Sequence, residues 1–596
     1  MKAGAPGAGQ RDASGTTILN MSRKHKRKPL QPASLNDTAP PGIRQRALPW
    51  GDRQAALIAL ILVFTASVRI VSTYWVFNHT SDEPAHITSG IEYLDKKTYD
   101  YDQEHPPLAR IMIGLGPYLA GERYVVPAGL ILRHDPRKGL ETLYAGQHYD
   151  RTVALARLGV LPLFWLACAV TFIWGRRCLG PAGAVIAVLL FTLLPPLLAH
   201  AGLATTDMAL AAFAPAGFLM LFFWSERPTL LRGLALGLLV GLGIASKFTM
   251  MPFLAAAAVV AIAFQFLAAL PTLGQVRAFL RARALSFAVA AVACVLVVWA
   301  VYRFSLGATP LFSFRVPAPE LFSGIQTVLK HNREGHPAFL LGKTGRTGWW
   351  YYYLVALAVK TPLPVLILLG AGLVLAIRRC REPAWRLPLA FSFGILLFCL
   401  SSRINIGVRH VLPVYVAFSI LAALAVLRLI ELSRTARWAG WAVGLLLIWL
   451  AAGGAWKHPD YIAYFNELAG GEPEKILVDS DLDWGQDMKR LGRRLHELGA
   501  QQVYLVSMPD IFPYLESRHG FPRLMETDPQ TPQPGWTAVG PTAWKAIWPL
   551  LKDYRGDMSL WFDHERPRER VGSMLLFYVP PPKTAGSTQQ TEGPRQ

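Results

Sequence analysis

The chain has 596 residues, of which 52% are hydrophobic and only 17% are charged, and its formal net charge is +21. A soluble protein would carry roughly a quarter charged residues, so this composition and the long apolar runs exclude an ordinary soluble protein and indicate a polytopic membrane protein. The positive excess lies in residues 1–456, because residues 457–596 carry a net charge of −3. The basic character therefore belongs to the membrane part, and no nucleic-acid partner is expected.

Residues 1–53 are basic and proline-rich, with the run RKHKRK at residues 23–28. This stretch is too long and too polar for an ordinary signal peptide, and the apolar run after it has full spanning length. We expect a disordered cytoplasmic arm followed by a retained first helix. Nucleic-acid binding by the arm is the alternative, and a solvated topogenic tail is the simpler interpretation.

Residues 54–456 are predicted to be an all-α transmembrane domain. Eleven apolar runs predict eleven spanning helices, two of them short (231–247 and 388–401). The runs are 55–77, 153–174, 182–203, 208–224, 231–247, 250–270, 285–302, 353–376, 388–401, 408–427 and 438–455. An odd number of spans places residues 457–596 on the side opposite to the N-terminus.

Positive charge in the short loops sets the predicted orientation, because cytoplasmic loops carry an excess of Lys and Arg. If the N-terminus is cytoplasmic, the short outer loops hold only Lys247, Arg403 and Arg409. The short cytoplasmic loops then hold fourteen arginines, at positions 176, 177, 227, 232, 277, 281, 283, 378, 379, 381, 386, 428, 434 and 437. This asymmetry predicts that residues 79–150 and 303–352 are outer loops.

The first outer loop concentrates the acids, with eleven of the 17 Asp and Glu of residues 54–456 lying in residues 79–150. Asp82 and Glu83 follow the first helix directly. An ionised carboxylate in a partly dry cleft can accept a proton from a hydroxyl nucleophile. The alternative is that Ser81 or Asp82 only caps a short helix with Pro84 in its first turn. Residues 108–121 are apolar but too short to span, which predicts an interfacial helix.

Several stretches, taken in order, resemble a known family. They are the Asp-Glu pair at 82–83, HPPL at 105–108, TTDMA at 205–209, ASKFT at 245–249, NIGVRHVLP at 405–413, YFNEL at 464–468 and DSDLDWGQD at 479–487. With the eleven-helix topology, they resemble the polyprenyl-phosphate-sugar-dependent glycosyltransferases of the GT-C fold, in the protein O-mannosyltransferase and aminoarabinose transferase superfamily. The last two stretches resemble a bacterial branch with an extra C-terminal domain.

The resemblance implies an inverting transfer in which an acceptor hydroxyl attacks the anomeric carbon of a lipid-linked sugar at the outer face of the membrane. Asp82 would be the general base, and Glu83 would support it or position the acceptor. The leaving polyprenyl phosphate is anionic, so it needs cationic stabilisation more than protonation. The resemblance implies no firmly bound cofactor and leaves room for a divalent cation.

Outer-side cations are the candidates for holding the donor phosphate: Lys247, Arg403, Arg409 and His410, with Arg303, Lys343 and Arg346 as looser candidates. Lys247 ends a helix and could instead extend its ammonium to the membrane surface. Arg403 and Arg409 break the charge asymmetry, which favours a ligand over a topological role.

Other polar side chains are predicted to support the site. His86, Glu104 and His105 would orient the carboxylates or be ordinary polar loop residues. Asp207 would contribute to the site or only cap the helix that it begins. The aromatic run at residues 349–353 would form an interfacial belt, or stack on a sugar ring or guide the isoprenoid chain.

Residues 457–582 are predicted to be a small outer-side α/β domain, followed by a disordered tail at 583–596. Residues 475–478, 502–506 and 574–579 are predicted strands, and residues 484–498 a helix with Asp483 as its N-cap. The acids at 479, 481 and 483 mimic a calcium loop, but Trp484 and Arg490 stand where the loop needs Gly and Glu, so no metal site is predicted.

The sequence thus predicts an integral membrane glycosyltransferase, with the bacterial inner membrane as its location and the periplasmic side as its active face. Its partners would be the lipid-linked donor, the bilayer and an acceptor that the sequence does not identify. The alternative is a transporter or flippase of lipid-linked sugars. A transporter is expected to show inverted repeats and polar sites at the membrane midplane, and neither is evident.

Overall fold

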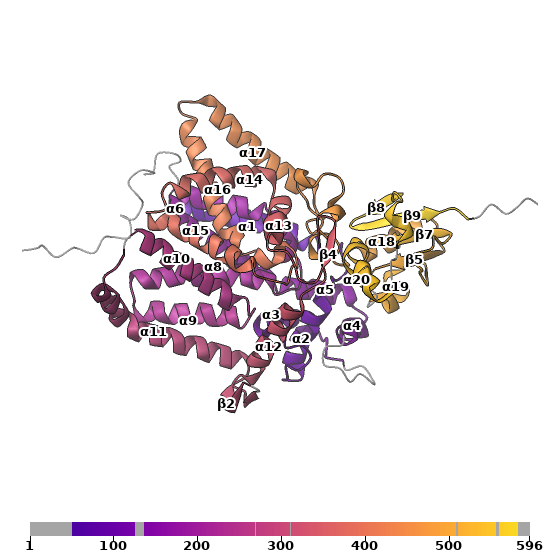
Figure 1. The fold of residues 1–596 in the computed structure, drawn as a ribbon, viewed down its shortest axis with the longest axis horizontal. Coiled ribbons are helices and arrows are strands. Elements are labelled where there is room, and N and C mark those ends of the chain that lie inside the picture. Colours follow the sequence, from indigo (N-terminus) through magenta and orange to yellow (C-terminus); the bar gives the residue numbers. More distant parts are fainter. Residues whose placement is uncertain are drawn as a thin grey trace, which may run out of the picture.

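The computed structural model describes residues 51–125, 136–268, 270–309, 311–507, 511–555 and 559–581. Of the predicted N-terminal arm only residues 51–53 belong to these ranges, and the tail at 583–596 lies outside them. Within them, a long bundle of helices carries a small sheet domain at one end (Figure 1). The predicted fold class, a helical membrane protein with a C-terminal α/β domain, is confirmed.

The bundle consists of apolar helices that run roughly side by side. They are α1 (Asp52–Val71), α6 (Leu161–Thr192), α7 (Pro195–Ala201), α8 (Asp207–Glu226), α9 (Leu230–Ile244), α10 (Met250–Ala268), α11 (Leu273–Val301), α13 (Tyr352–Lys360), α14 (Leu363–Ile377), α15 (Pro383–Cys399), α16 (Val414–Leu432) and α17 (Arg437–Trp456). The most buried of the helices long enough to span, α8 and α16, pack against α6, while α1, α11 and α17 expose large apolar side chains as lipid-facing helices do.

All eleven predicted apolar runs coincide with helices, but fewer are full-length spans. Seven helices in the described ranges are long and apolar enough to cross a bilayer, and α13 with α14 makes an eighth if this bent pair counts as one span. Helices α9 and α15 have only 15 and 17 residues. Spanning length in the sequence therefore overstates the number of straight spans.

The chain changes direction at a glycine between the predicted runs 153–174 and 182–203, and at a proline within the predicted run 353–376. Helix α6 breaks at Gly180 (φ 76°), and a Cβ added at Gly175 would lie 3.2 Å from Cα of Ala184, so the chain folds back on itself there. Nine residues of straight helix would separate them by about 13 Å. The run at 353–376 bends by 119° between α13 and α14, where Pro362 interrupts helical hydrogen bonding.

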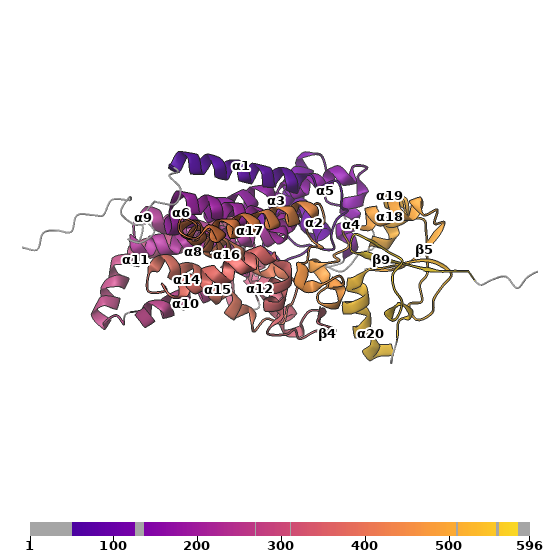
Figure 2. The ribbon, with the colours of Figure 1, turned by 90° about the horizontal axis from the view of Figure 1, so that it is seen from above.

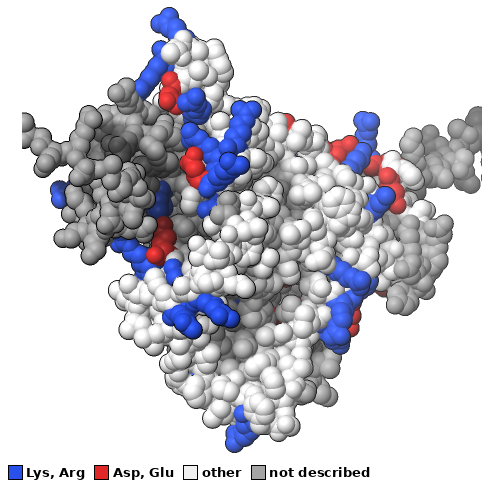
Figure 3. All heavy atoms as spheres, turned by 60° about the vertical axis from the view of Figure 1, so that its left-hand side comes forward, with Lys and Arg blue, Asp and Glu red and all other residues white. Residues whose placement is uncertain are grey.

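The two ends of the bundle differ in charge. At the end far from the sheet domain, Asp52 pairs with Arg176 and Glu226 with Arg177, and Arg283 donates to the Ser225 carbonyl. Figure 3 shows that end, where Lys and Arg side chains stand out from a largely uncharged surface and outnumber the acids. Several of the fourteen predicted loop arginines thus lie together at one end.

The opposite end is covered by shorter elements from the two predicted outer loops. The first loop forms α2 (Glu83–Asp95), α3 (Pro107–Leu119), α4 (Pro136–Ala145) and α5 (Tyr149–Leu158), and α3 is a short helix where one was predicted at residues 108–121. The second forms the hairpin β1 (Leu306–Thr309) and β2 (Phe312–Pro317), helix α12 (Pro319–Glu334), and the hairpin β3 (Ala338–Leu340) and β4 (Lys343–Gly345).

The C-terminal domain follows α17 at this same end, as Figures 1 and 2 both show. Its five-stranded sheet has the order β6-β5-β7-β9-β8, with β5 parallel to β6 and β7 and the remaining pairs antiparallel. The strands are β5 (Gln502–Val506), β6 (Arg523–Met525), β7 (Gly535–Val539), β8 (Glu569–Val571) and β9 (Met574–Val579), and the helices are α18 (Met488–Glu497), α19 (Phe512–His519) and α20 (Trp548–Arg555).

The predicted strands at 502–506 and 574–579 are confirmed as β5 and β9, but the one at 475–478 is wrong. Leu477 and Val478 are buried by packing against other parts of the chain rather than by strand pairing. The predicted helix begins at Met488 rather than 484. Asp487 stands at its N-cap position without a side-chain cap bond, so the Asp483 cap is also wrong.

Candidate active site

Asp82 lies at the start of α2, at the end of the bundle that carries the sheet domain. It occupies the N-cap position, yet its side chain makes no capping hydrogen bond. Its carboxylate instead accepts a hydrogen bond from Nη1 of Arg409 at 2.7 Å, and 36% of the side chain is exposed. The capping role weighed for this residue is thus not what the side chain does.

Arg409 joins residues far apart in the sequence into one charge cluster. Its Nη1 lies 3.9 Å from Oδ2 of Asp207, and its guanidinium lies over the Trp484 ring, 4.1 Å from the centroid. Asp207 in turn forms a buried ion pair with Lys247. Asp207 is the first residue of α8 and Thr206 its N-cap, so Asp207 serves ion pairing and the predicted capping role is wrong.

The electrostatics of this cluster keep Asp82 ionised. Burial raises the pKa of the Asp82 carboxyl, but the adjacent positive charge of Arg409 and its hydrogen bond outweigh that effect, and the pKa is lowered from its usual value. Because its pKa is lowered, Asp82 is an ionised carboxylate at neutral pH. Its side chain is also partly exposed to solvent. Asp82 is therefore able to accept a proton.

Glu83 differs sharply from its neighbour. It is fully buried, and its two oxygens accept from Nε and Nη2 of Arg157 at 2.8 Å each. The backbone N–H groups of Thr80 and Ala204 also donate to it. With its acceptor positions used in this way, Glu83 acts as a structural anchor that holds the start of α2 against α5 and the segment before α8.

His86 and His105 lie behind Asp82 in a network organised by Arg110. The guanidinium donates to His86 Nδ1 at 3.0 Å and forms an ion pair with Asp102. The His86 and His105 rings are 5.0 Å apart, edge to face. Burial, with the nearby Arg110 charge, lowers the pKa of His86 to about 4. The His86 ring is therefore neutral at neutral pH and carries a proton on only one of its two nitrogens.

Close packing of α2 on α3 holds this network in place. A Cβ added at Gly90 would lie 2.0 Å from the carbonyl oxygen of Arg110, and one at Gly114 would lie 2.5 Å from the Gly90 carbonyl carbon. Only glycine permits such an approach of two helix backbones. The two glycines therefore set the distance between Arg110 and His86.

Glu104 lies in a separate pair. Its Oε1 is 2.6 Å from Nδ1 of His331 on α12, whose Nε2 is 3.3 Å from Nδ1 of His336. Hydrogen bonding to the carboxylate raises the pKa of His331. In the described part of the chain, no group of three or more His, Cys, Asp or Glu side chains is arranged to hold a metal ion.

Arg403 and His410 are not ion-paired with the cluster. Arg403 is exposed and donates to the Arg333 carbonyl at the end of α12. His410 is buried and stacks on Tyr353, and its Nδ1 has no hydrogen-bond partner within the described residues. Of the predicted phosphate ligands, the structure thus gathers Arg409 and Lys247 next to Asp82 and Asp207 and leaves Arg403 at the rim.

The stretch at 479–487 closes the site from the C-terminal side. The backbone N–H of Ser81 donates to the Trp484 carbonyl at 3.0 Å, and the Asp481 carboxylate accepts from the Val408 N–H at 3.0 Å. Lys360 donates to the carbonyl of Asp481. The link that bears the sheet domain is therefore part of the wall around Asp82.

Sequence reasoning missed Arg157, Arg110 and Lys360 as determinants of the site. Arg157 and Lys360 each interrupt a predicted apolar run (153–174 and 353–376), and charges within such runs are rare and usually paired. That signal was available in the sequence. The carboxylate partner of Arg157 lies 74 positions away and the carbonyl that Lys360 contacts at Asp481 lies 121 positions away, so these pairs depend on the fold.

Comparison with known proteins gives one family match. Residues 155–291 match the family model described as dolichyl-phosphate-mannose-protein mannosyltransferase. This confirms the resemblance to that glycosyltransferase superfamily over a stretch that contains Asp207 and Lys247 and excludes Asp82 and Arg409. No curated protein sequence matches the chain.

The chain is also similar to solved structures at low identity. ArnT from Cupriavidus metallidurans bound to undecaprenyl phosphate is 15% identical, with 87% of this chain and 97% of that chain covered and a TM-score of 0.48. The Archaeoglobus fulgidus oligosaccharyltransferase in complex with Zn and sulfate is 14% identical, with coverages of 79% and 61% and a TM-score of 0.44. AglB from the same organism, in complex with an inhibitory peptide and a dolichol-phosphate, is 11% identical, with coverages of 79% and 64% and a TM-score of 0.40.

Proposed function

We propose that this protein is an inverting glycosyltransferase that moves a sugar from a polyprenyl-phosphate donor to an acceptor hydroxyl at the outer face of the membrane. The observation that carries the proposal is the Asp82–Arg409 pair, an ionised and partly exposed carboxylate 2.7 Å from a guanidinium. A base for the acceptor hydroxyl and a cation for the leaving phosphate are the two groups that such a transfer needs within one site.

The chemistry follows from these two groups. The acceptor hydroxyl gives its proton to an oxygen of Asp82 while its own oxygen bonds to the anomeric carbon from the side opposite to the donor phosphate. The bond between that carbon and the phosphate oxygen breaks, and the electron pair leaves with the polyprenyl phosphate. A single displacement of this kind inverts the anomeric configuration.

Arg409 would link donor binding to the strength of the base. Before the donor binds, its guanidinium neutralises Asp82 and lowers the carboxyl pKa. A bound phosphate competes for the same planar donor fork, which suits phosphate as well as carboxylate. Drawing Arg409 toward the phosphate would raise the Asp82 pKa and make it a stronger base when a donor is present.

Lys247 and Asp207 would hold Arg409 in reach of both partners. Lys247 is only 6% exposed and is ion-paired with Asp207, which itself lies 3.9 Å from Arg409. We propose that Lys247 adds positive potential below the phosphate rather than contacting it. Arg403 at the rim and His410 beside Tyr353 remain candidate ligands for the entering donor.

The arginine-rich end of the bundle supports the sidedness of the proposal. Short cytoplasmic loops carry the excess of Lys and Arg in membrane proteins, so the opposite end, with Asp82 and the sheet domain, would face the periplasm of a bacterial inner membrane. The donor would enter laterally from the bilayer and the acceptor from the aqueous side.

The test is Asp82→Asn in purified full-length protein, assayed with native lipid extract as donor source. Asn keeps the size but cannot accept the proton, so the transfer rate should fall by about 10² to 10⁴. Asp100→Asn is the matched control, because Asp100 lies exposed in the same loop. Wild-type transfer by Asp82→Asn, with product identity checked by mass spectrometry, would remove Asp82 as the base.

A further inference from the structure

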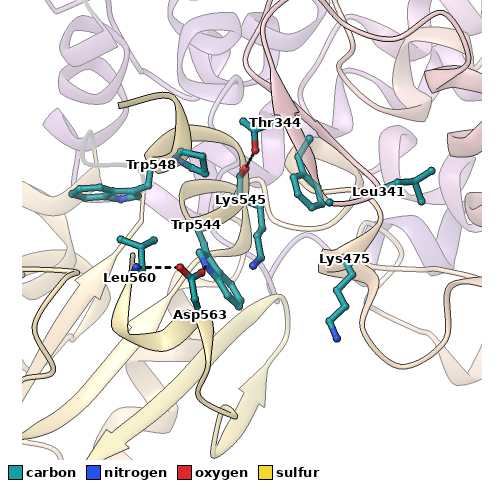
Figure 4. A pocket seen from close by; sticks show the side chains of 11 residues that line it. Leu341, Thr344, Lys475, Trp544, Lys545, Trp548, Leu560 and Asp563 are labelled. Atoms are coloured by element: carbon teal, nitrogen blue, oxygen red, sulfur yellow. Dashed lines mark hydrogen bonds between the residues drawn. The ribbon is translucent and has the colours of Figure 1, made fainter. Parts of the chain in front are cut away.

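A cavity of about 440 Å³ lies between the β3–β4 hairpin of the second outer loop and the C-terminal domain (Figure 4). Its lining includes polar and aromatic side chains from both sides. Those that matter here are Thr344, Lys475, Trp544, Lys545, Trp548 and Asp563. None of them belongs to the charge cluster around Asp82, and the volume suits a single sugar unit or a small part of a larger ligand.

One aromatic wall of the cavity is held rigidly. The indole N–H of Trp544 donates to Oδ1 of Asp563 at 2.6 Å, while Oδ2 accepts from the Leu560 N–H at 3.1 Å. Both carboxylate oxygens of Asp563 thus accept hydrogen bonds that fix this wall. Trp548, one turn further along the chain, adds a second indole to the lining, as Figure 4 shows.

The cationic side of the cavity is formed by Lys545. Its ammonium lies 3.3 Å from the centroid of the Trp544 ring, and no carboxylate is within ion-pair distance of it among the described residues. Lys475, at the rim, is exposed and pairs with Glu472. Partial burial lowers the pKa of Lys545. The charges of Asp563 and Glu474 act on Lys545 from beyond ion-pair distance and raise this pKa, so the ammonium, in contact with the Trp544 face, is still open to contact an anion.

Both walls are tied together across the cavity. Thr344 on β4 donates to the Lys545 carbonyl at 2.7 Å, and Phe339 on β3 packs with Val478 and Ala546. The Asp479 N–H donates to Thr542, two residues before Trp544, at 2.8 Å, and the Asp481 carboxylate accepts from the Val408 N–H, next to Arg409, at 3.0 Å. The cavity is therefore adjacent to the site at Asp82 but separated from it by an apolar cluster.

We propose that this cavity binds an anionic saccharide unit of the acceptor, a pyranose ring carrying a phosphate or a carboxylate. Indole faces carry negative potential and suit the C–H face of a sugar ring, while Lys545 would contact the anionic substituent. The inference rests on the proposed transferase function for its role, since it would hold the acceptor while another of its hydroxyls reaches Asp82. Binding in itself does not depend on catalysis.

Equilibrium dialysis of the purified full-length protein against radiolabelled glucose 6-phosphate, glucuronate and glucose tests the proposal without any donor. At least one anionic sugar should bind about tenfold more tightly than glucose, the usual worth of a hydrogen bond to a charged group. Lys545→Gln should abolish this preference and Lys545→Arg should retain it. Trp548→Ala should weaken the binding of all three sugars.

Lys330→Gln is the matched control, because Lys330 is an exposed lysine on α12 of the second outer loop that does not line the cavity. It should leave every affinity unchanged. The two anionic sugars separate phosphate from carboxylate recognition. Equal binding of glucose and both anionic sugars, no binding at all, an unaltered preference in Lys545→Gln, or equally tight binding of inorganic phosphate would overturn the proposal.

Failure of the proposed function would show elsewhere. If saccharide binding persists but Asp82→Asn transfers sugar normally, the catalytic assignment falls and the cavity stands. If binding is absent while Asp82→Asn abolishes transfer, the cavity assignment falls and the catalytic one stands.

Discussion

The two ends of the helical bundle use the same residue type in opposite ways. At the end that carries the sheet domain, Arg157 and Arg409 are buried against carboxylates, with side chains 1% and 9% exposed. At the other end, Arg176 and Arg428 also pair with acids, but their side chains are 50% and 63% exposed. The difference lies in solvent access rather than in pairing.

That difference indicates which arginines stabilise the fold and position the candidate site. An exposed pair exchanges water for a partner at little net gain, while a buried charge without its partner is strongly unfavourable. Arginines at the exposed end can serve orientation in the membrane through their charge alone. Those at the buried end fix the positions of individual carboxylates.

The largest effect should come from breaking the buried Arg157–Glu83 pair. Arg157→Met leaves the Glu83 carboxylate without its charge partner, so the free energy of unfolding should fall by about 3–5 kcal/mol. Adding Glu83→Gln should recover much of this loss, because the uncompensated charge is then removed. Denaturant titration in detergent, followed by tryptophan fluorescence, measures both variants.

Arg176→Ala is the matched change at the exposed end. Its pair with Asp52 is solvent-exposed, and removing it should change stability by less than about 1 kcal/mol. Comparable destabilisation by Arg157→Met and Arg176→Ala would erase the contrast between the two ends.

A medium effect is expected at Asp479, which adjoins the buried end. Burial raises the pKa of its carboxyl to about 6, above the value in the unfolded chain. Between about pH 4 and 6 the native state then binds the extra proton, so the contribution of Asp479 to stability is present at low pH and is lost as the pH rises through 6. Asp479→Asn cannot ionise, and Asn tolerates its left-handed backbone (φ 59°).

The variant should therefore be more stable than wild type by roughly 3 kcal/mol at pH 7 and nearly equal to it near pH 4. Thermal unfolding across this pH range compares the two proteins. A constant difference at all pH values would mean that Asp479 does not titrate in this window.

The smallest of these effects sharpens the role of Arg409. Arg409→Lys keeps the charge but loses the planar fork, so the affinity for the donor should fall about tenfold, and Arg409→Ala should lower it further. Direct binding of polyprenyl phosphate to the purified protein measures this. Unchanged affinity in both variants would confine Arg409 to neutralising Asp82.

Parts of this fold can be predicted from local sequence. Long apolar runs located the helices of the bundle, and short continuous apolar runs located β5 and β9, because a segment buried on all sides needs apolar residues throughout. The strand prediction at 475–478 was wrong because its apolar residues are buried without pairing to another strand. The reversal at Gly180 agrees with the two separate spans predicted at 153–174 and 182–203, whereas the 119° bend at Pro362 falls inside a run predicted as one helix.

The sequence by itself determined that this is a helical membrane protein with an acid-rich loop after its first helix, arginine-rich short loops and a small C-terminal domain. Composition and charge pattern depend on whether a segment lies in lipid or in water, so they can be interpreted residue by residue. Only the tertiary structure decided that Asp82 meets Arg409, 327 positions away, while Glu83 is buried on Arg157. Adjacent carboxylates of like chemistry differ because the fold, acting over long range, exposes one to solvent and encloses the other.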